Sequence, residues 1–371
     1  MTTNPLLSET ALTLKTLCSS CGLSKTGPKR VLVQRLRHAA RHFQPVSPSA
    51  RILSIDLGLK NFAFTLLTPA PQPRKQQPPQ PTPNSNNDNS PLTSPIRLHA
   101  WHRLDLTQPS IQPLKPTKYA PTSHQEEEKQ EEEEEEDPYS PPALAALTTS
   151  LIKTHLLPLR PTHVLIERQR FRTGGAAAIF EWTLRVNSLE AMLHAAFAAL
   201  RGNVNDVEGG WGTASGGRVE SVLPRAVAGF LFPAEAAEAG GVDGGEGGEE
   251  KKGKKGGAAA AYHMLKREKV DMLGGFLAAA GGGGGLVVPE KGQAREMVRL
   301  FLAGVERRRE GKRRSGKRKG VGVEAGGKEV EEVVDKMDDL SDAVLQGMVW
   351  LQWQRNLEAL IKERPELLEE E

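Results

Sequence analysis

Short runs of apolar residues alternate along this chain with longer amphipathic segments, and this pattern predicts a mixed α/β fold. Runs rich in β-branched and aromatic residues predict β-strands at 52–55, 62–67, 96–106, 163–166 and 219–223. Apolar residues at helical spacing predict helices at 143–157, 176–200, 224–230, 262–276 and 290–309, and a last helix that begins near residue 336 and runs through GMVWLQWQRNLEALI. Strands that alternate with helices indicate a sheet covered by helices.

Segments without either periodicity separate these elements. They are rich in Pro, Gln and Asn at 68–95, in Glu at 109–142, and in Gly, Ala and charged residues at 201–218, 234–261 and 304–332, and we expect disordered insertions there. The acidic run EEEKQEEEEEED is expected to be solvated, although its charge also suits a basic DNA surface of the same protein. Because only 5% of the 371 residues are aromatic, with 37 Gly and 26 Pro, a domain with long insertions is favoured over several complete domains.

The N-terminal segment reads as two short helices, LTLKTLCSSCG and PKRVLVQRLRHAA, joined by a turn. Apolar side chains that include Leu12 and Val31 are expected to form a small core, while Lys25, Lys29 and Arg30 face outward. The pattern resembles a SAP-type helical module over residues 1–46, which would bind DNA phosphates through these basic residues. The alternative is a basic helical hairpin that binds a protein or stays solvated.

Charge and cysteine content limit the other possibilities. Net charge is only +3, but the first 55 residues hold one acidic residue, Glu9, against eight Lys and Arg, which suits nucleic acid and also mitochondrial import. The two cysteines, Cys18 and Cys21, have no second CxxC or His cluster to complete a zinc site, so they are either small apolar residues in a reducing compartment or a redox or metal site. No run of 18 apolar residues appears, and we expect no membrane partner.

Carboxylates recur where predicted strands end and where the last helix begins. Asp56 follows the first strand, and Glu167 ends the strand in THVLIERQRFRT. In KMDDLSDAVLQ, Asp342 lies four residues after Asp338 and three after Asp339, so it shares a helix face with both. A buried carboxylate is costly without compensation, and gathered carboxylates repel one another unless cations bind them. Asp56 followed by Gly58 is also explained by turn chemistry alone.

Basic residues accompany these carboxylates. Arg168, Arg170 and Arg172 follow Glu167 directly, and we expect this edge to bind DNA phosphates because guanidinium groups bind phosphate in a bidentate manner. Lys266 and Lys269, on the helix predicted at 262–276, are further candidates for DNA contacts.

Three of these motifs together support a resemblance to a known family. SIDLGLKNFAF, IERQRFRT and DDLSDAVLQ resemble the acidic motifs of the fungal mitochondrial Holliday-junction resolvases, which are relatives of RuvC in the RNase H-like superfamily. SVLPRAVAGFLF resembles the segment between the second and third motifs, and the SAP-like module precedes them. The resemblance implies an RNase H-like mixed five-stranded sheet flanked by helices, in a catalytic domain at 50–362.

The same resemblance implies a catalytic site and a mechanism. The catalytic residues would be Asp56, Glu167, Asp339 and Asp342. These carboxylates would hold two Mg²⁺ or Mn²⁺ ions about 4 Å apart, and Asp338 and Asp339 compete for one of the ligand positions. One ion would activate water and the other would stabilise the leaving 3′ oxygen, so that the products carry 5′ phosphates. No small-molecule cofactor is expected.

The implied substrate is four-way junction DNA in mitochondria, where the enzyme would serve recombination and segregation of mitochondrial DNA. A homodimer would place two sites symmetrically and resolve the junction by paired nicks. Nuclear localisation is the alternative location. Two other functions stay open: a non-catalytic protein that binds branched DNA, and an RNase H-type nuclease that cuts RNA/DNA hybrids.

Overall fold

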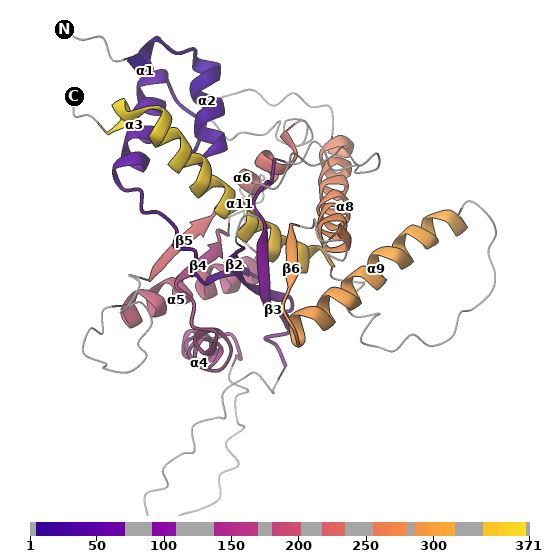
Figure 1. The fold of residues 1–371 in the computed structure, drawn as a ribbon. Coiled ribbons are helices and arrows are strands. Elements are labelled where there is room, and N and C mark those ends of the chain that lie inside the picture. The colour runs from indigo at the N-terminus through magenta and orange to yellow at the C-terminus, as the bar shows by residue number, and fades with distance from the viewer. Residues whose placement is uncertain are drawn as a thin grey trace, which may run out of the picture.

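The computed structural model describes residues 5–70, 91–108, 137–169, 180–201, 217–233, 255–279, 286–315 and 337–368 (Figure 1). Its centre is a six-stranded sheet with the order β5-β4-β1-β2-β3-β6. The strands are β1 (Ile52–Asp56), β2 (Phe62–Pro69), β3 (Ile96–Leu104), β4 (His163–Glu167), β5 (Arg218–Val222) and β6 (Val287–Pro289). β1, β2 and β3 form an antiparallel meander, β4 and β5 extend it in parallel beside β1, and β6 pairs in parallel with β3.

The predicted α/β class and the first five strands are confirmed, but the prediction of five strands in the sheet is wrong by one. The sixth strand, β6, spans only three residues and follows a glycine run, so it has no periodicity of its own. It forms because Ile96 to Leu98 of β3 offer an open edge on which it pairs.

The helices cover the sheet on both sides. They are α1 (Pro5–Ser8), α2 (Ala11–Ser20), α3 (Lys29–Arg41), α4 (Pro141–Leu151), α5 (Glu181–Arg201), α6 (Pro224–Leu231), α8 (Lys255–Ala279), α9 (Gln293–Ser315) and α11 (Met337–Glu363). α4 continues as a π-helical turn (Ile152–Leu156) and a 3₁₀ turn (Leu157–Leu159), and a 3₁₀ turn (Pro365–Leu367) follows α11. In the part of the chain that is described, no helix is long and apolar enough to cross a membrane.

Two predicted insertions are shorter than expected. α8 begins at Lys255, inside the insertion predicted at 234–261, and α9 extends to Ser315, inside the insertion predicted at 304–332. Alanines 258–261 and the charged residues after Arg307 are good helix formers, which explains why low-complexity composition misled the prediction there. The greater part of each predicted insertion lies outside the described residues.

Alternation along β1 decides which side chains face which layer. Leu53 and Ile55 pack into the core under α4 and α5, whereas Ile52 belongs to the core under α11, α8 and α9. Since successive strand residues point to opposite faces, Ser54 and Asp56 point to the side of α11. Figure 1 shows α11 crossing the sheet on one side and α4 and α5 covering the other.

Contacts at the middle of α11 fix that helix against the sheet. Gln346, which is buried, donates hydrogen bonds to Ser54 Oγ and to the Ile55 carbonyl, both at 3.1 Å. At the next position, a Cβ on Gly347 would lie 2.5 Å from Leu67 Cδ1 and 3.3 Å from Ser54 Cβ, so the helix approaches β1 and β2 too closely for a larger residue.

The last turns of α11 bind the N-terminal helical module formed by α1, α2 and α3 (Figure 1). Leu357 and Leu360 share a core with residues of that module, among them Leu14 and Leu32. Asn356 Nδ2 also donates a 2.7 Å hydrogen bond to the Ser20 carbonyl. The module is therefore packed on the domain that contains the sheet through a shared helix.

The core of the N-terminal module differs in part from the predicted one. Cys18 and Cys21 are free and buried in it, which confirms their role as small apolar residues. Burial raises the pKa of the Cys21 thiol to about 11, so the reactive thiolate is disfavoured. Leu12, predicted in the core, is 75% exposed, and Val31 is also exposed, because α2 and α3 turn these positions to solvent.

Candidate active site

Asp56 and Glu167 lie side by side at the ends of neighbouring strands. β1 and β4 run in parallel with Ile55 opposite Ile166, so the next residue on each strand is a carboxylate. Both point to the face covered by α11, since each follows a residue of the opposite core. Asp56 is only 9% exposed. Burial, and then the neighbouring charge of Glu167, raise the pKa of Asp56.

The first turns of α11 bring further carboxylates to this pair. The pKa of Asp56 is raised well above its usual range, chiefly by burial and then by the negative charges of Glu167, Asp342 and Asp339. The structure therefore gathers residues that are more than 280 positions apart in the sequence into one electrostatic cluster, as the motifs predicted.

Two lysines of α8 contact the helical aspartates. Lys266 Nζ lies 2.5 Å from Asp338 Oδ2, and Lys269 Nζ lies 2.7 Å from Asp342 Oδ1. Burial acts to lower the pKa of Lys269, but the neighbouring carboxylates, Asp342 first, raise it above its usual value. Lys269 therefore stays a cation inside an acidic site. The sequence, which shows only a basic helix there, did not predict this location.

The donor set of this site suits hard divalent cations, because every candidate ligand is a carboxylate. Its present arrangement does not: among the described residues, no group of three or more His, Cys, Asp or Glu side chains is placed so that it could hold a metal ion. Asp338 and Asp342 instead each have a lysine ammonium as an ion-pair partner. The chemistry of the residues therefore fits a divalent metal ion.

The predicted DNA-binding residues occupy separate parts of the surface. Lys25, Lys29 and Arg30 are exposed on the N-terminal module, and Arg168 is exposed next to Glu167. Arg170 and Arg172 lie outside the described residues. Contact with DNA stays a prediction for all of these residues, and also for Lys266 and Lys269, whose ion pairs with aspartates are described above.

Several residues that position the site were missed from the sequence. Gln346 and Gly347 fix α11 on the sheet, and Trp101 Nε1 donates a 3.0 Å hydrogen bond to the Leu340 carbonyl beside the aspartates. Gln169 Nε2 donates a longer bond, of 3.4 Å, to Glu167 Oε2. The only local signal was a polar Gln in an otherwise apolar helix face, because the partners are far away in the sequence.

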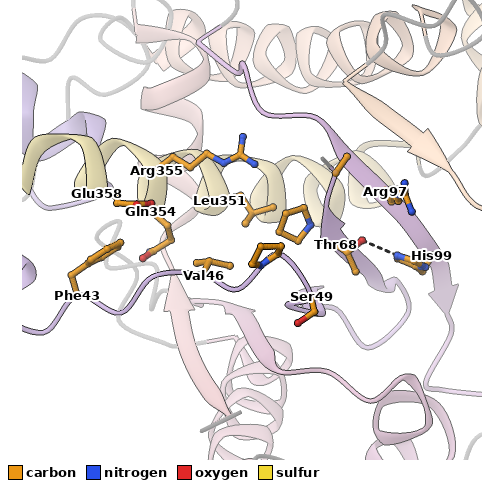
Figure 2. A pocket seen from close by; sticks show the side chains of 13 residues that line it. Phe43, Val46, Ser49, Thr68, Arg97, His99, Leu351, Gln354, Arg355 and Glu358 are labelled. Carbon is orange, nitrogen blue, oxygen red and sulfur yellow. Dashed lines mark hydrogen bonds between the residues drawn. The ribbon is translucent and has the colours of Figure 1, made fainter. Parts of the chain in front are cut away.

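A separate cavity of about 460 Å³ lies at the opposite end of the strands (Figure 2). It is lined by residues that leave the N-terminal module, by the end of β2 and the start of β3, and by α11. Thr68 and His99 form a 2.9 Å hydrogen bond on its wall, and Arg97, Arg355 and Glu358 also line it. It contains none of the predicted catalytic carboxylates, so the acidic cluster is the candidate active site.

Comparison with known proteins identifies similar families, a similar curated protein and a similar solved structure. A family model described as mitochondrial resolvase Ydc2 / RNA splicing MRS1 matches residues 52–360, and a SAP domain model matches residues 11–41. Cruciform cutting endonuclease 1, mitochondrial, of Schizosaccharomyces pombe is 30% identical over 190 residues, which is 51% of this chain and 56% of that protein. The chain thus spans about half the length of this curated relative. The crystal structure of the yeast mitochondrial Holliday junction resolvase Ydc2 matches with a TM-score of 0.49 and 22% identity over 95% of this chain and 97% of that chain.

The mixed sheet, the carboxylates at the ends of β1 and β4 and on α11, and the N-terminal module define a mixed α/β protein with a SAP domain. The chain belongs to the mitochondrial resolvase Ydc2 / RNA splicing MRS1 family. The predicted family is thereby confirmed. The family description and the fission yeast relative's name both specify mitochondria, in agreement with the predicted localisation.

Proposed function

We propose that this protein is a structure-selective endonuclease that resolves four-way DNA junctions in mitochondria by paired symmetric nicks. The observation that carries the proposal is the carboxylate cluster formed by Asp56, which is buried, with Glu167, Asp339 and Asp342. A protein that only binds DNA gains nothing from carboxylates beside phosphates, because like charges repel. The name of the fission yeast relative, a cruciform cutting endonuclease, supports the same activity.

In this proposal the carboxylates hold two Mg²⁺ or Mn²⁺ ions, which would supply activation of water and stabilisation of the leaving 3′ oxygen, leaving 5′-phosphate ends. Asp56 and Glu167 are suited to be shared ligands, because they stand side by side on rigid strands. Asp342 approaches them from α11, held there by Gln346 one turn later. Of the two remaining aspartates, Asp339 is the better candidate ligand, because its charge acts on Asp56.

The basic residues would bind the arms of the junction. Lys25, Lys29 and Arg30 on the SAP domain are exposed and suited to phosphate contacts, and Arg168 would bind the strand next to the cluster. A homodimer would present two such sites to the two-fold symmetric junction, so that one binding event allows both nicks.

The decisive experiment compares cleavage of a labelled four-way junction by wild type and by Asp56→Asn, with Mg²⁺ present or chelated. We expect symmetric, metal-dependent nicks that the variant lacks. A linear duplex of the same sequence and an RNA/DNA hybrid serve as control substrates. Equal cleavage of junction and linear duplex would refute junction selectivity, and preferential cleavage of the hybrid would indicate an RNase H-type nuclease.

A non-catalytic role is the second candidate, and one observation favours keeping it. The family description joins resolvases with RNA splicing proteins, so membership alone does not decide between cutting and binding. Tight junction binding without nicks by either protein, at any Mg²⁺ concentration, would make the binding function the better account.

A further inference from the structure

We propose that Lys269 is a positioning residue of the acidic site: its ammonium group holds Asp342 and competes with a divalent cation for that carboxylate. The inference rests on the proposed metal-dependent function only in assuming that cations bind the carboxylate cluster. It assigns to α8 a part in the active site, which the acidic motifs by themselves do not include.

Geometry distinguishes the Lys269 ion pair from an ordinary surface ion pair. The 2.7 Å contact joins a lysine side chain that is 12% exposed to an aspartate side chain that is 31% exposed. An ammonium group so far from water needs a fixed partner, whereas exposed pairs contribute little. Lys269 is therefore held inside the site by the carboxylates around it.

Two lysine–aspartate ion pairs join α8 to α11 at neighbouring turns of the helices. Lys266 and Lys269 are three residues apart on α8, and their partners Asp338 and Asp342 are four apart on α11, so each set shares one helix face. The helices contact each other directly. The lysine side chain is more exposed in the Lys266–Asp338 pair, at 35%, than in the Lys269–Asp342 pair, so Lys266 is a matched control for Lys269.

The charge at the site gives Lys269 a role. Asp56 and Glu167 share their end of the sheet with Asp342, and without a cation their charges would repel. The Lys269 ammonium supplies the missing positive charge and takes an oxygen of Asp342 that a metal ion would need.

The test is direct Mn²⁺ binding to the full chain without DNA, followed by electron paramagnetic resonance, together with thermal unfolding in EDTA and in Mn²⁺. The variants are Lys269→Met, Lys269→Arg and Lys266→Met. We expect Lys269→Met to unfold at a lower temperature in EDTA, to gain more from Mn²⁺ than wild type, and to bind the first Mn²⁺ on the order of tenfold more tightly. Lys269→Arg, which keeps the charge, should resemble wild type, and Lys266→Met should show a smaller change.

Several results would overturn the inference. If Lys269→Met unfolds earlier by the same amount with and without Mn²⁺ and its Mn²⁺ affinity is unchanged, the lysine only packs. If Mn²⁺ affinity is unchanged while junction binding weakens with a lower salt dependence, the lysine is a DNA contact. Absence of Mn²⁺ binding in all variants also overturns it. Wild type that shows the expected competition but cuts no junction would instead refute the proposed function and leave this inference standing.

Discussion

Replacing Gly347 by alanine tests whether the approach of α11 to the sheet sets the geometry of the acidic site. The added methyl group would lie 2.5 Å from Leu67 Cδ1 and 3.3 Å from Ser54 Cβ. Both neighbours are fully buried, so any movement of either must take place inside the core. Either the Leu67 side chain changes its rotamer or α11 moves away from β2, and in the second case Asp342 moves relative to Asp56.

Two effects of opposite sign decide the stability of Gly347→Ala. Alanine in place of glycine inside a helix gains about 1 kcal/mol from propensity. Overpacking a filled core costs typically about 1–3 kcal/mol. Because the nearer contact is well inside the van der Waals distance and its partner is buried, we expect the cost to prevail, with a net loss of about 1 kcal/mol or more.

The assay pairs urea denaturation with junction cleavage, and Gly229→Ala on α6 is the matched control. No atom lies within 4 Å of a Cβ at Gly229, so only the propensity gain remains and this variant should be stabilised by about 0.5–1 kcal/mol. Gly347→Ala should lose both stability and cleavage rate at saturating Mg²⁺. If it is stabilised as much as Gly229→Ala and cuts at the wild-type rate, the close packing of α11 does not control the site.

Three further predictions follow from the site and the SAP domain. Because the pKa of Asp56 is raised in the fold, its contribution to stability is present below its ordinary titration range and is lost as the pH rises through the raised value. Asp56→Asn should therefore raise the free energy of unfolding without metal at pH 7 relative to wild type, with a smaller difference at pH 4. Urea denaturation in EDTA measures both values. Leu360→Ala, in the core shared by α11 and the SAP domain, should cost about 2 kcal/mol or more and weaken junction binding; unchanged stability would show that the domain is not docked there. Lys29→Ala should lower the slope of log junction affinity against log salt concentration by about one. Arg41→Ala is the comparison variant: an equal reduction of its slope would indicate that the whole surface of α3 binds DNA nonspecifically.

The sequence predicted those parts of the fold that local periodicity determines. The first five strands and the long last helix were found because each carries its own apolar pattern, and three acidic motifs indicated the carboxylate cluster. β6 was missed because its three residues become a strand only by pairing with β3. α8 was predicted too short because a run of alanines within low-complexity sequence has helix propensity but no amphipathic pattern.

The contacts around the carboxylates could not be predicted in the same way. Lys269 looked like an outward DNA contact, since the sequence of α8 shows a basic helix but not what packs against it. The roles of Gln346 and Gly347 depend on β1 and β2, which precede them by almost 300 residues, so nothing near them in the chain indicates a partner. The motifs therefore predicted the carboxylates of the site, whereas the residues that position these carboxylates depend on tertiary contacts.

One helix links all the parts of this molecule. α11 carries the aspartates in its first turns, docks on the sheet through Gln346 and Gly347, and ends in the core of the SAP domain at Leu357 and Leu360. Its 27 residues span about 40 Å at 1.5 Å per residue. Because α11 is packed on the sheet at its middle and on the SAP domain at its end, we expect the basic surface of the SAP domain to keep a fixed distance from the carboxylates. In the proposed function the SAP domain would therefore be a fixed part of the DNA-binding surface, and its contact with one arm of a junction would orient the strand at the acidic site.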